Sequence, residues 1–314
     1  MNSPINVISE LKNLMAERGI KFTLTSAVHL NEIQSVSAVK RNGELGEIHP
    51  FFIKRQDCAI PDCAKSVLLL AIPLPLYYEC VFHQDSKEYR MYGISAIQPD
   101  MTEFVAKTFK KHDHFIEAVN NLRFKRLAVQ SGLAEYGRNN ITYVAGMGSN
   151  VRYAAFYTDI DVHDETWRDV CNAEMCADCG ACIKNCPTGA IRADRFMIDS
   201  YNCLAGMTEE AAPFPDWVSK TAHHSIYDCV RCQICCPLNM PLEKPEEIVF
   251  DEQETRIILS GAPYGDVSNA LTKKIYDLGL AKWPDGIPRN IRLVFDLIDK
   301  GLFCMKDEQE AAKA

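Results

Sequence analysis

Two cysteine runs near the middle of the chain constrain its fold more than any other feature, because cysteines at such short intervals are typical of ligands that bind metal centres. The first run, residues 176–187, reads Cys-x2-Cys-x2-Cys-x3-Cys-Pro. This spacing is the signature of a loop that binds a [4Fe–4S] cluster, and the fourth cysteine usually binds the other cluster of a pair. The run therefore predicts two clusters and one-electron redox chemistry.

The second run, residues 229–237, is one ligand short of the full motif, and Cys203 between the two runs is the natural replacement. Cys235 offers an alternative to Cys236, and Cys171 is left over. The predicted ligands are Cys176, Cys179, Cys182 and Cys236 for one cluster, and Cys186, Cys203, Cys229 and Cys232 for the other.

Zinc and disulfides explain these cysteines less well than iron and sulfide do. A zinc ribbon would show two Cys-x2-Cys pairs without the longer run. The chain has 14 cysteines, and no secretory signal pattern or apolar run of membrane-spanning length is apparent at the sequence level. Cysteine-rich proteins of a reducing compartment bind metal more often than they form disulfides. We therefore expect a cytoplasmic iron–sulfur protein with no membrane segment.

The charge balance is weak evidence against broad nucleic-acid binding. The formal net charge is −8, from 34 basic and 42 acidic residues, and affinity for phosphates depends on lysine and arginine. A local basic patch that includes Lys125, Arg126 and Arg152 stays open as an alternative. A tRNA partner is accordingly conceivable but disfavoured by charge.

The apolar pattern predicts three regions, with an α/β (α+β) core over residues 1–165 in front of a ferredoxin-like double-cluster module over residues 166–242. The region 243–314 is predicted to be a helical extension. The expected elements of the core are a helix within residues 1–19, a buried strand over Ser66–Leu74, a helix over Thr102–Leu122, and strands over Ile141–Ala145 and Tyr153–Thr158 around a glycine loop.

One segment limits the protein families that the chain can resemble. Residues 127–139 read Leu-Ala-Val-Gln-Ser-Gly-Leu-Ala-Glu-Tyr-Gly-Arg-Asn, and they precede the Gly148-Ser149 loop, a strand ending at Thr158-Asp159 and the cluster module with Pro-Thr-Gly-Ala-Ile at 187–191. Over about residues 60–240 the chain resembles the epoxyqueuosine reductases and their relatives, the reductive dehalogenases. The resemblance implies a cobalamin-binding α/β core followed by two [4Fe–4S] clusters.

The resemblance also implies a set of cobalamin contacts. Glycines would permit close approach of the backbone to the flat corrin, and Arg138 and Asn139 could bond to its amide side chains. The alternative is a glycine-punctuated turn with surface Arg and Asn. The implied contacts are Gly132, Leu133, Tyr136, Gly137, Arg138, Asn139 and Tyr143.

The chain departs from the epoxyqueuosine reductase pattern at the expected proton donor. Those enzymes carry Asp-Tyr-His, whereas the nearest match here is Pro-Asp-Met-Thr at 99–102. Asp100 is the candidate catalytic acid, with helix capping as the alternative. No match to the C-terminal helical-repeat domain of many of these enzymes is found, so we expect a different substrate.

Other reactive residue types are expected to play ordinary roles. The pair His223-His224 is expected to lie in an exposed loop. Four cysteines outside the cluster module are expected to be small buried apolar residues. They are Cys58, Cys63, Cys80 and Cys304.

The functional hypothesis is a cobalamin-dependent iron–sulfur reductase that receives electrons from reduced ferredoxin or flavodoxin. Its cofactor would carry the difficult chemistry, and the protein would position it. Two alternatives stay open: a non-catalytic electron-transfer protein, and a reductase of a corrinoid or other cofactor carried by a partner protein.

Overall fold

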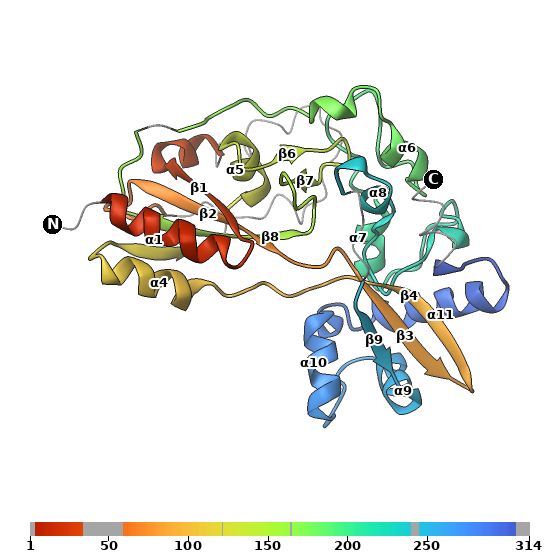
Figure 1. Cartoon of the computed structure of the whole chain (residues 1–314). Coiled ribbons are helices and arrows are strands. Elements are labelled where there is room, and N and C mark those ends of the chain that lie inside the picture. The colour runs from red at the N-terminus through yellow and green to blue at the C-terminus, as the bar shows by residue number, and fades with distance from the viewer. Residues whose placement is uncertain (1–3, 34–58, 121, 164, 240–244, 306–314) are drawn as a thin grey trace. The chain divides into compact units, whose positions relative to one another are not determined.

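The computed structural model describes residues 4–33, 59–120, 122–163, 165–239 and 245–305 (Figure 1). The chain divides into two compact units, and each unit is built from three separate segments of the sequence. Unit 1 comprises residues 1–74, 98–179 and 195–197, and unit 2 comprises residues 75–97, 180–194 and 198–314.

Unit 1 is built on an antiparallel sheet of four strands in the order β1-β2-β8-β5. The strands are β1 (Lys21–Ser26), β2 (Ser66–Pro73), β8 (Val151–Thr158) and β5 (Ile116–Val119). The predicted strand over Ser66–Leu74 is confirmed as β2, and residues 67–71 are fully buried. Its side chains alternate between two apolar clusters, which is why the whole strand is apolar.

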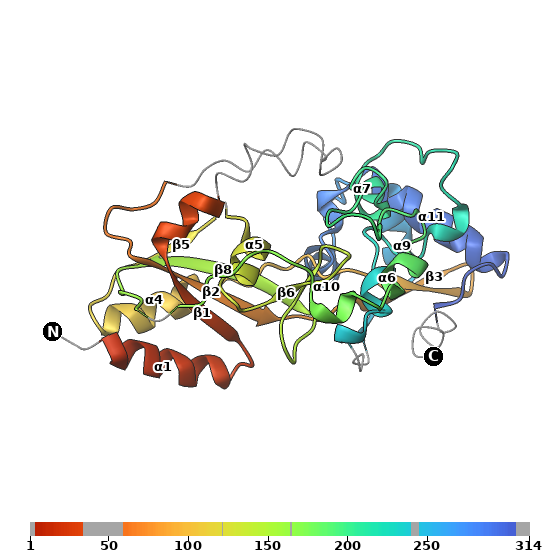
Figure 2. The same ribbon diagram turned by 90° about the horizontal axis from the view of Figure 1, so that it is seen from above.

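Helices cover both faces of this sheet (Figure 2). Helix α1 (Pro4–Ala16), which confirms the predicted first helix, packs with α4 (Thr102–Lys111) on one face. Helix α5 (Phe124–Gln130) packs on the other face. The 3-10 helix η1 (Ala27–His29) follows β1.

The prediction of one helix over Thr102–Leu122 is wrong beyond Lys111. Helix α4 ends there, and Asp113 adopts a left-handed conformation with φ of 59°, which ends a helix. The following residues, Ile116–Val119, pair antiparallel with β8 as edge strand β5. The aromatic and apolar residues at helical spacing are therefore shared between a helix and a strand.

The predicted strand over Ile141–Ala145 is reduced to β7 (Thr142–Tyr143), whereas the predicted strand over Tyr153–Thr158 lies within β8. Strand β7 pairs with β6 (Glu135–Tyr136) and not across the glycine loop with β8. At that loop only an isolated bridge joins Val144 to Gly148.

Unit 2 contains a mixed sheet in the order β4-β3-β9. Its strands are β3 (Tyr78–Gln84), β4 (Lys87–Gly93) and β9 (Glu247–Phe250). Strands β3 and β4 form a hairpin whose two loop residues, Asp85 and Ser86, both have positive φ, as a type I′ turn requires. Strand β9 runs parallel to β3, so the hairpin and the C-terminal region share one sheet.

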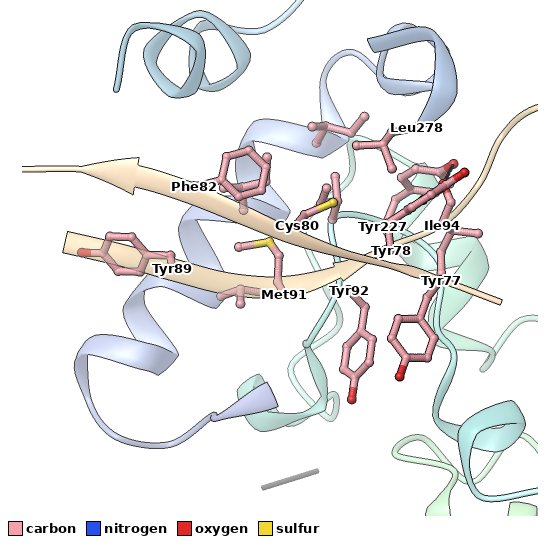
Figure 3. Close-up of a cluster of buried hydrophobic side chains, with 14 of the residues drawn as sticks. Tyr77, Tyr78, Cys80, Phe82, Tyr89, Met91, Tyr92, Ile94, Tyr227 and Leu278 are labelled. Carbon is pink, nitrogen blue, oxygen red and sulfur yellow. Dashed lines mark hydrogen bonds between the residues drawn. The ribbon is translucent and has the colours of Figure 1, made fainter. Parts of the chain in front are cut away.

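Three helices pack on this sheet: α9 (Glu252–Ser260), α10 (Asn269–Asp277) and α11 (Gly286–Asp299). The 3-10 helix η5 (Leu280–Lys282) precedes α11. Figure 3 shows the buried side chains that β3 and β4 contribute, among them Phe82, Tyr89 and Met91. The hairpin had no counterpart among the sequence-based elements.

The four cysteines outside the cluster module do not share one environment. Cys80 is fully buried, as expected, whereas Cys63 and Cys304 are exposed, so the expectation of burial is wrong for those two. Cys58 lies outside the described residues.

The boundaries of the two compact units differ from those of the three predicted regions, 1–165, 166–242 and 243–314. The division into these three regions stays a prediction. The difference arises because the hairpin over residues 75–97 packs with the C-terminal helices, although it lies within the first region of the sequence. Within the described ranges, no helix is long and apolar enough to cross a membrane.

Candidate metal centre

The predicted cluster ligands lie on short helices and the turns between them. In unit 2, α6 (Ala181–Asn185) carries Cys182 and packs against α8 (Arg231–Ile234), which carries Cys232. Helix α7 (Leu204–Glu209) begins directly after Cys203. The remaining short elements of the module are the 3-10 helices η2 (Glu174–Cys176), η3 (Lys220–Ala222) and η4 (Pro237–Asn239).

The two predicted ligand sets differ in their placement. Of the first set, Cys176 and Cys179 belong to unit 1, whereas Cys182 and Cys236 belong to unit 2. The second set belongs entirely to unit 2. All eight predicted ligands and Cys235 are half-buried, whereas Cys171 is exposed.

Backbone amides favour the thiolate form of two cysteines of the second set. Cys203 is the N-cap residue of α7, and the nearby backbone amides of Ala205 and Gly206 favour its thiolate and oppose the rise in its pKa. The backbone amide of Arg231 favours the thiolate of Cys229 in the same way. Amides near sulfur stabilise thiolates and tune iron–sulfur clusters.

The thiols of the second set lie close enough to influence one another's ionisation. Burial raises the pKa of Cys203 to about 11, and the nearby charges of Asp228 and Cys186 raise it further. Burial also raises the pKa of Cys229, with Cys203 as a further cause. Bound iron would supply the positive charge that offsets this cost and favours the thiolates. These sulfur donors, with their amide partners, fit an iron–sulfur cluster.

The turns that precede and follow α6 need glycine. Gly180 and Gly189 have φ of 69° and 66°, and a Cβ on either would meet nothing within 4 Å. Backbone conformation, and not crowding, therefore requires glycine at these two positions.

Within the described ranges, no three His, Cys, Asp or Glu side chains are grouped so as to hold a single metal ion.

The expectation of an exposed histidine pair is wrong, because His223 and His224 are 3% and 0% exposed. Nδ1 of His224 donates to the carbonyl of Ala222 at 2.9 Å, and Nε2 accepts the N–H of Val230 at 3.4 Å. Burial lowers the pKa of His224 to about 3, so the ring is neutral. His224 thus anchors the residue that follows Cys229.

The candidate cobalamin contacts in unit 1 form a hairpin with internal bonds. Asn139 donates from Nδ2 to the hydroxyl of Tyr143 at 2.9 Å. A Cβ on Gly137 would lie 2.6 Å from both the Tyr143 ring and Asn139 Oδ1. These three buried residues therefore support one another.

The same hairpin holds the segment that leads into the cluster module. Tyr136 O accepts the N–H of Ala173 at 2.6 Å, and Arg138 donates to the carbonyl of Cys176 at 2.9 Å. The ring of Tyr136 also packs edge-on against Phe196, with centroids 5.4 Å apart. Sequence reasoning missed this supporting role, since no local pattern signals it.

Gly132 and Leu133 differ from the hairpin residues, because they line an open cavity of about 450 Å³. Polar groups of Lys12, Lys21 and Ser131 line it as well. Gly132 has φ of 79°, so backbone conformation also requires glycine at this position.

Asp100 lies just before helix α4 and binds the backbone at its start. Its carboxylate accepts the N–H of Thr102, the first residue of α4, at 2.8 Å. That bond to the Thr102 backbone is the main cause of a lowered pKa, and Asp100 is exposed. A proton donor needs a raised pKa at neutral pH. The geometry thus favours the capping alternative, and the catalytic role stays a prediction.

Comparison with known proteins confirms the cluster module. Residues 175–239 match the family described as 4Fe-4S double cluster binding domain. This chain is therefore an iron–sulfur protein of the double-cluster kind. The assignment of individual ligands stays a prediction.

Curated relatives are epoxyqueuosine reductases. The enzyme of Francisella cf. novicida (strain Fx1) is 32% identical over 114 residues, which are 36% of this chain and 31% of the relative. The enzyme of Bacillus subtilis (strain 168) is 28% identical over 115 residues, 37% of this chain and 28% of the relative. The matched segment thus spans about a third of the length of these relatives.

Solved structures share the fold over most of the chain. A crystal structure of epoxyqueuosine reductase with a tRNA-Tyr epoxyqueuosine-modified tRNA stem loop matches with a TM-score of 0.60 and 18% identity, over 93% of this chain and 81% of the other. The enzyme from Streptococcus thermophilus matches with a TM-score of 0.59 and 18% identity, over 98% and 88%. The mixed α/β fold is therefore that of these enzymes.

Proposed function

We propose that this chain, a relative of the epoxyqueuosine reductases, is an iron–sulfur reductase that passes electrons through two [4Fe–4S] clusters to a bound cobalamin. The observation that carries the proposal is a double-cluster domain within a chain that has the fold of these enzymes almost throughout. Clusters of this type move single electrons over a wide range of potentials. Reduced ferredoxin or flavodoxin is the proposed donor.

The ligand partition is part of this proposal. The set in unit 2 is supported by the backbone amides that favour the thiolates of Cys203 and Cys229, and by the mutual influence of Cys186, Cys203 and Cys229 on ionisation. Cys232, on α8, completes it. The first set uses the remaining cysteines of the two runs. That set is Cys176, Cys179, Cys182 and Cys236.

Cobalamin would supply a metal centre able to deliver electrons to a carbon substrate, which amino-acid side chains cannot do. Gly132 and Leu133 are the residues best placed to contact it, because they line the open cavity of unit 1. Lys12 and Lys21 would offer cationic donors to its polar side chains. The Tyr136–Tyr143 hairpin would act mainly by holding neighbouring backbone in place.

Epoxyqueuosine in tRNA is the first substrate to test, since the structure of a relative contains a modified tRNA stem loop. Two observations make a different substrate our expectation. The net charge of −8 opposes phosphate binding, and Asp100 accepts hydrogen bonds as an exposed carboxylate with a lowered pKa. Tight tRNA binding and Asp100-dependent turnover would contradict this expectation.

The lowered pKa of the exposed Asp100 carboxylate also favours a second candidate function. In this alternative the chain is an electron-transfer protein that reduces a partner or a partner-bound corrinoid. Both candidates require the clusters, and only the first requires cobalamin bound to this chain. Absorption spectra of anaerobically purified, cluster-replete protein titrated with cobalamin separate them. Saturable binding followed by reduction with a chemical donor supports the reductase, and undetectable binding supports the electron-transfer protein.

A further inference from the structure

Helix α11 of the C-terminal region docks on the C-terminal end of α7, the helix that Cys203 caps. The last carbonyls of a helix have no partner within it. Here Arg289 donates to the carbonyl of Met207 at 3.1 Å, and Asn290 donates to that of Thr208 at 2.9 Å. A Cβ on Gly286 would lie 3.0 Å from Thr208 O, so glycine permits the close approach.

Asn290 also binds the segment that leads to Cys229. Its Nδ2 atom donates a second hydrogen bond, of 2.9 Å, to the carbonyl of Ile226. An amide nitrogen carries two hydrogens, and both are used here by backbone carbonyls of separate segments. Asn290 is 1% exposed, so water cannot replace it when it is lost.

Thr208 makes the same connection from the α7 side. Its hydroxyl donates to the carbonyl of Ala205 at 2.7 Å and accepts the N–H of Asp228 at 2.7 Å. Asp228 has a left-handed backbone with φ of 65°, and its carbonyl accepts a 2.7 Å bond from Ser225 Oγ. The residue immediately before Cys229 is thereby held at both its amide and its carbonyl.

We propose that Asn290 is a positioning residue of the second cluster, which fixes the segment carrying Cys203 against the segment carrying Cys229. The inference rests on the proposed function, since it takes these two cysteines as ligands of one cluster. Cys203 is the N-cap residue of α7, so the first turn of this helix follows it directly, and the polar contacts at the other end of the helix hold the helix in place. Loosening them alters hydrogen bonding to sulfur and solvent access, which set cluster potential.

The test is a redox titration of anaerobically purified full-length protein, in which electron paramagnetic resonance monitors both clusters. Asn290→Leu is nearly isosteric and neutral, and it leaves the carbonyls of Thr208 and Ile226 without their donor. We expect a shifted midpoint potential for one cluster and faster loss of that cluster to a chelator, with the other unchanged. The shifted step is expected to be the one that Cys203→Ala abolishes.

Val294→Ala is the matched control, because Val294 is fully buried on the same helix and forms only apolar contacts. It should lower the melting temperature while leaving both potentials at their wild-type values. Thr208→Val is the second test variant. It removes the acceptor for Asp228 N–H at similar volume, and it decides the question if Asn290→Leu fails to fold.

Unchanged potentials in the folded Asn290→Leu variant, or in Thr208→Val when the former does not fold, would overturn the inference. Equal shifts of both clusters, shared by Val294→Ala, would also overturn it, since they would indicate general loosening. Failure of the proposed function would be distinguishable, because both clusters of the wild-type protein would then still titrate while its cobalamin binding is undetectable.

Discussion

The guanidinium of Arg138 donates a 2.9 Å hydrogen bond to the backbone carbonyl of Cys176, and so joins the candidate cobalamin hairpin to the first predicted cluster ligand. Both residues belong to unit 1. Three further contacts support this link: Tyr136 O with Ala173 N, the Tyr136 ring with Phe196, and Asn140 Nδ2 with the carbonyl of Phe196. The hairpin therefore has a structural task whatever it binds.

Replacing Arg138 with Met should keep the packing of the side-chain stem and remove the charged donor. We expect a loss of about 1.5 kcal/mol in the free energy of unfolding, the lower end for hydrogen bonds to charged groups, measured by anaerobic urea titration. Arg256→Met is the control, since Arg256 is an exposed arginine whose ion pair is with Glu252, four residues before it on the same helix. Equal losses in the two variants would contradict a specific role for Arg138.

Iron and sulfide analysis of anaerobically purified protein should give about eight of each per chain, as two cubane clusters require. The expectation follows from the double-cluster domain at residues 175–239. A count near four, or stoichiometric zinc in place of iron, would contradict it. The absorption spectrum should show a broad band that bleaches on reduction.

Exchange of Cys203 for Ala tests the ligand partition. Cys203 lies at the start of α7, where two backbone amides favour its thiolate, so its loss should remove or degrade one cluster, and iron content should fall toward half. Cys171→Ala is the matched control, because Cys171 is exposed and left over from both sets; it should keep full iron content. Equal loss in both variants, or none in Cys203→Ala, would refute the partition.

Filling the unit 1 cavity should weaken cobalamin binding without touching the clusters. Leu133→Trp places a bulky ring in a space of about 450 Å³, and we expect at least about a tenfold loss of affinity, or 1.4 kcal/mol. Val28→Trp is the control on the same unit, since Val28 is 70% exposed. Position 137 suits this test poorly, because a side chain there would strike Tyr143. Unchanged affinity in Leu133→Trp would move the binding site elsewhere.

Glu209 on α7 should make stability depend on pH. Burial, together with the charges of Asp228 and Glu210, raises its pKa from 4.5 to about 7. The folded state then holds the proton more tightly than the unfolded chain, so stability is fullest below pH 4.5 and falls as pH rises toward and through 7. Glu209→Gln should flatten this fall in the anaerobic melting temperature.

Glu103→Gln, an exposed change on α4, is the control for that measurement. It should retain the wild-type decrease between pH 5 and pH 8, since it leaves Glu209 in place. A Glu209→Gln variant with the same pH profile as wild type would show that the carboxyl of Glu209 ionises at its ordinary pKa.

Local patterns predicted those features whose cause is itself local. The cysteine spacing indicated the double-cluster domain, because a cubane draws several of its ligands from cysteines at short intervals on a turning chain. The unbroken apolar run of β2 predicted a buried strand, since both faces of that strand are covered. The resemblance to epoxyqueuosine reductases was also carried by contiguous residues, and it is confirmed. Individual ligands, cobalamin contacts and Asp100 stay predictions.

What the sequence determined by itself was therefore the cluster chemistry, the family resemblance, the first helix and the central strand. Tertiary structure decided which partners the remaining segments found. The apolar residues within 116–119 have helical spacing, but the segment forms a strand because it pairs with β8. His224 is buried because Tyr92 of β4, far away in the sequence, pairs with the backbone of residues 224–226. The hairpin over residues 75–97 joins the C-terminal helices through β9. Such pairings depend on residues far apart in the chain, which no local period encodes.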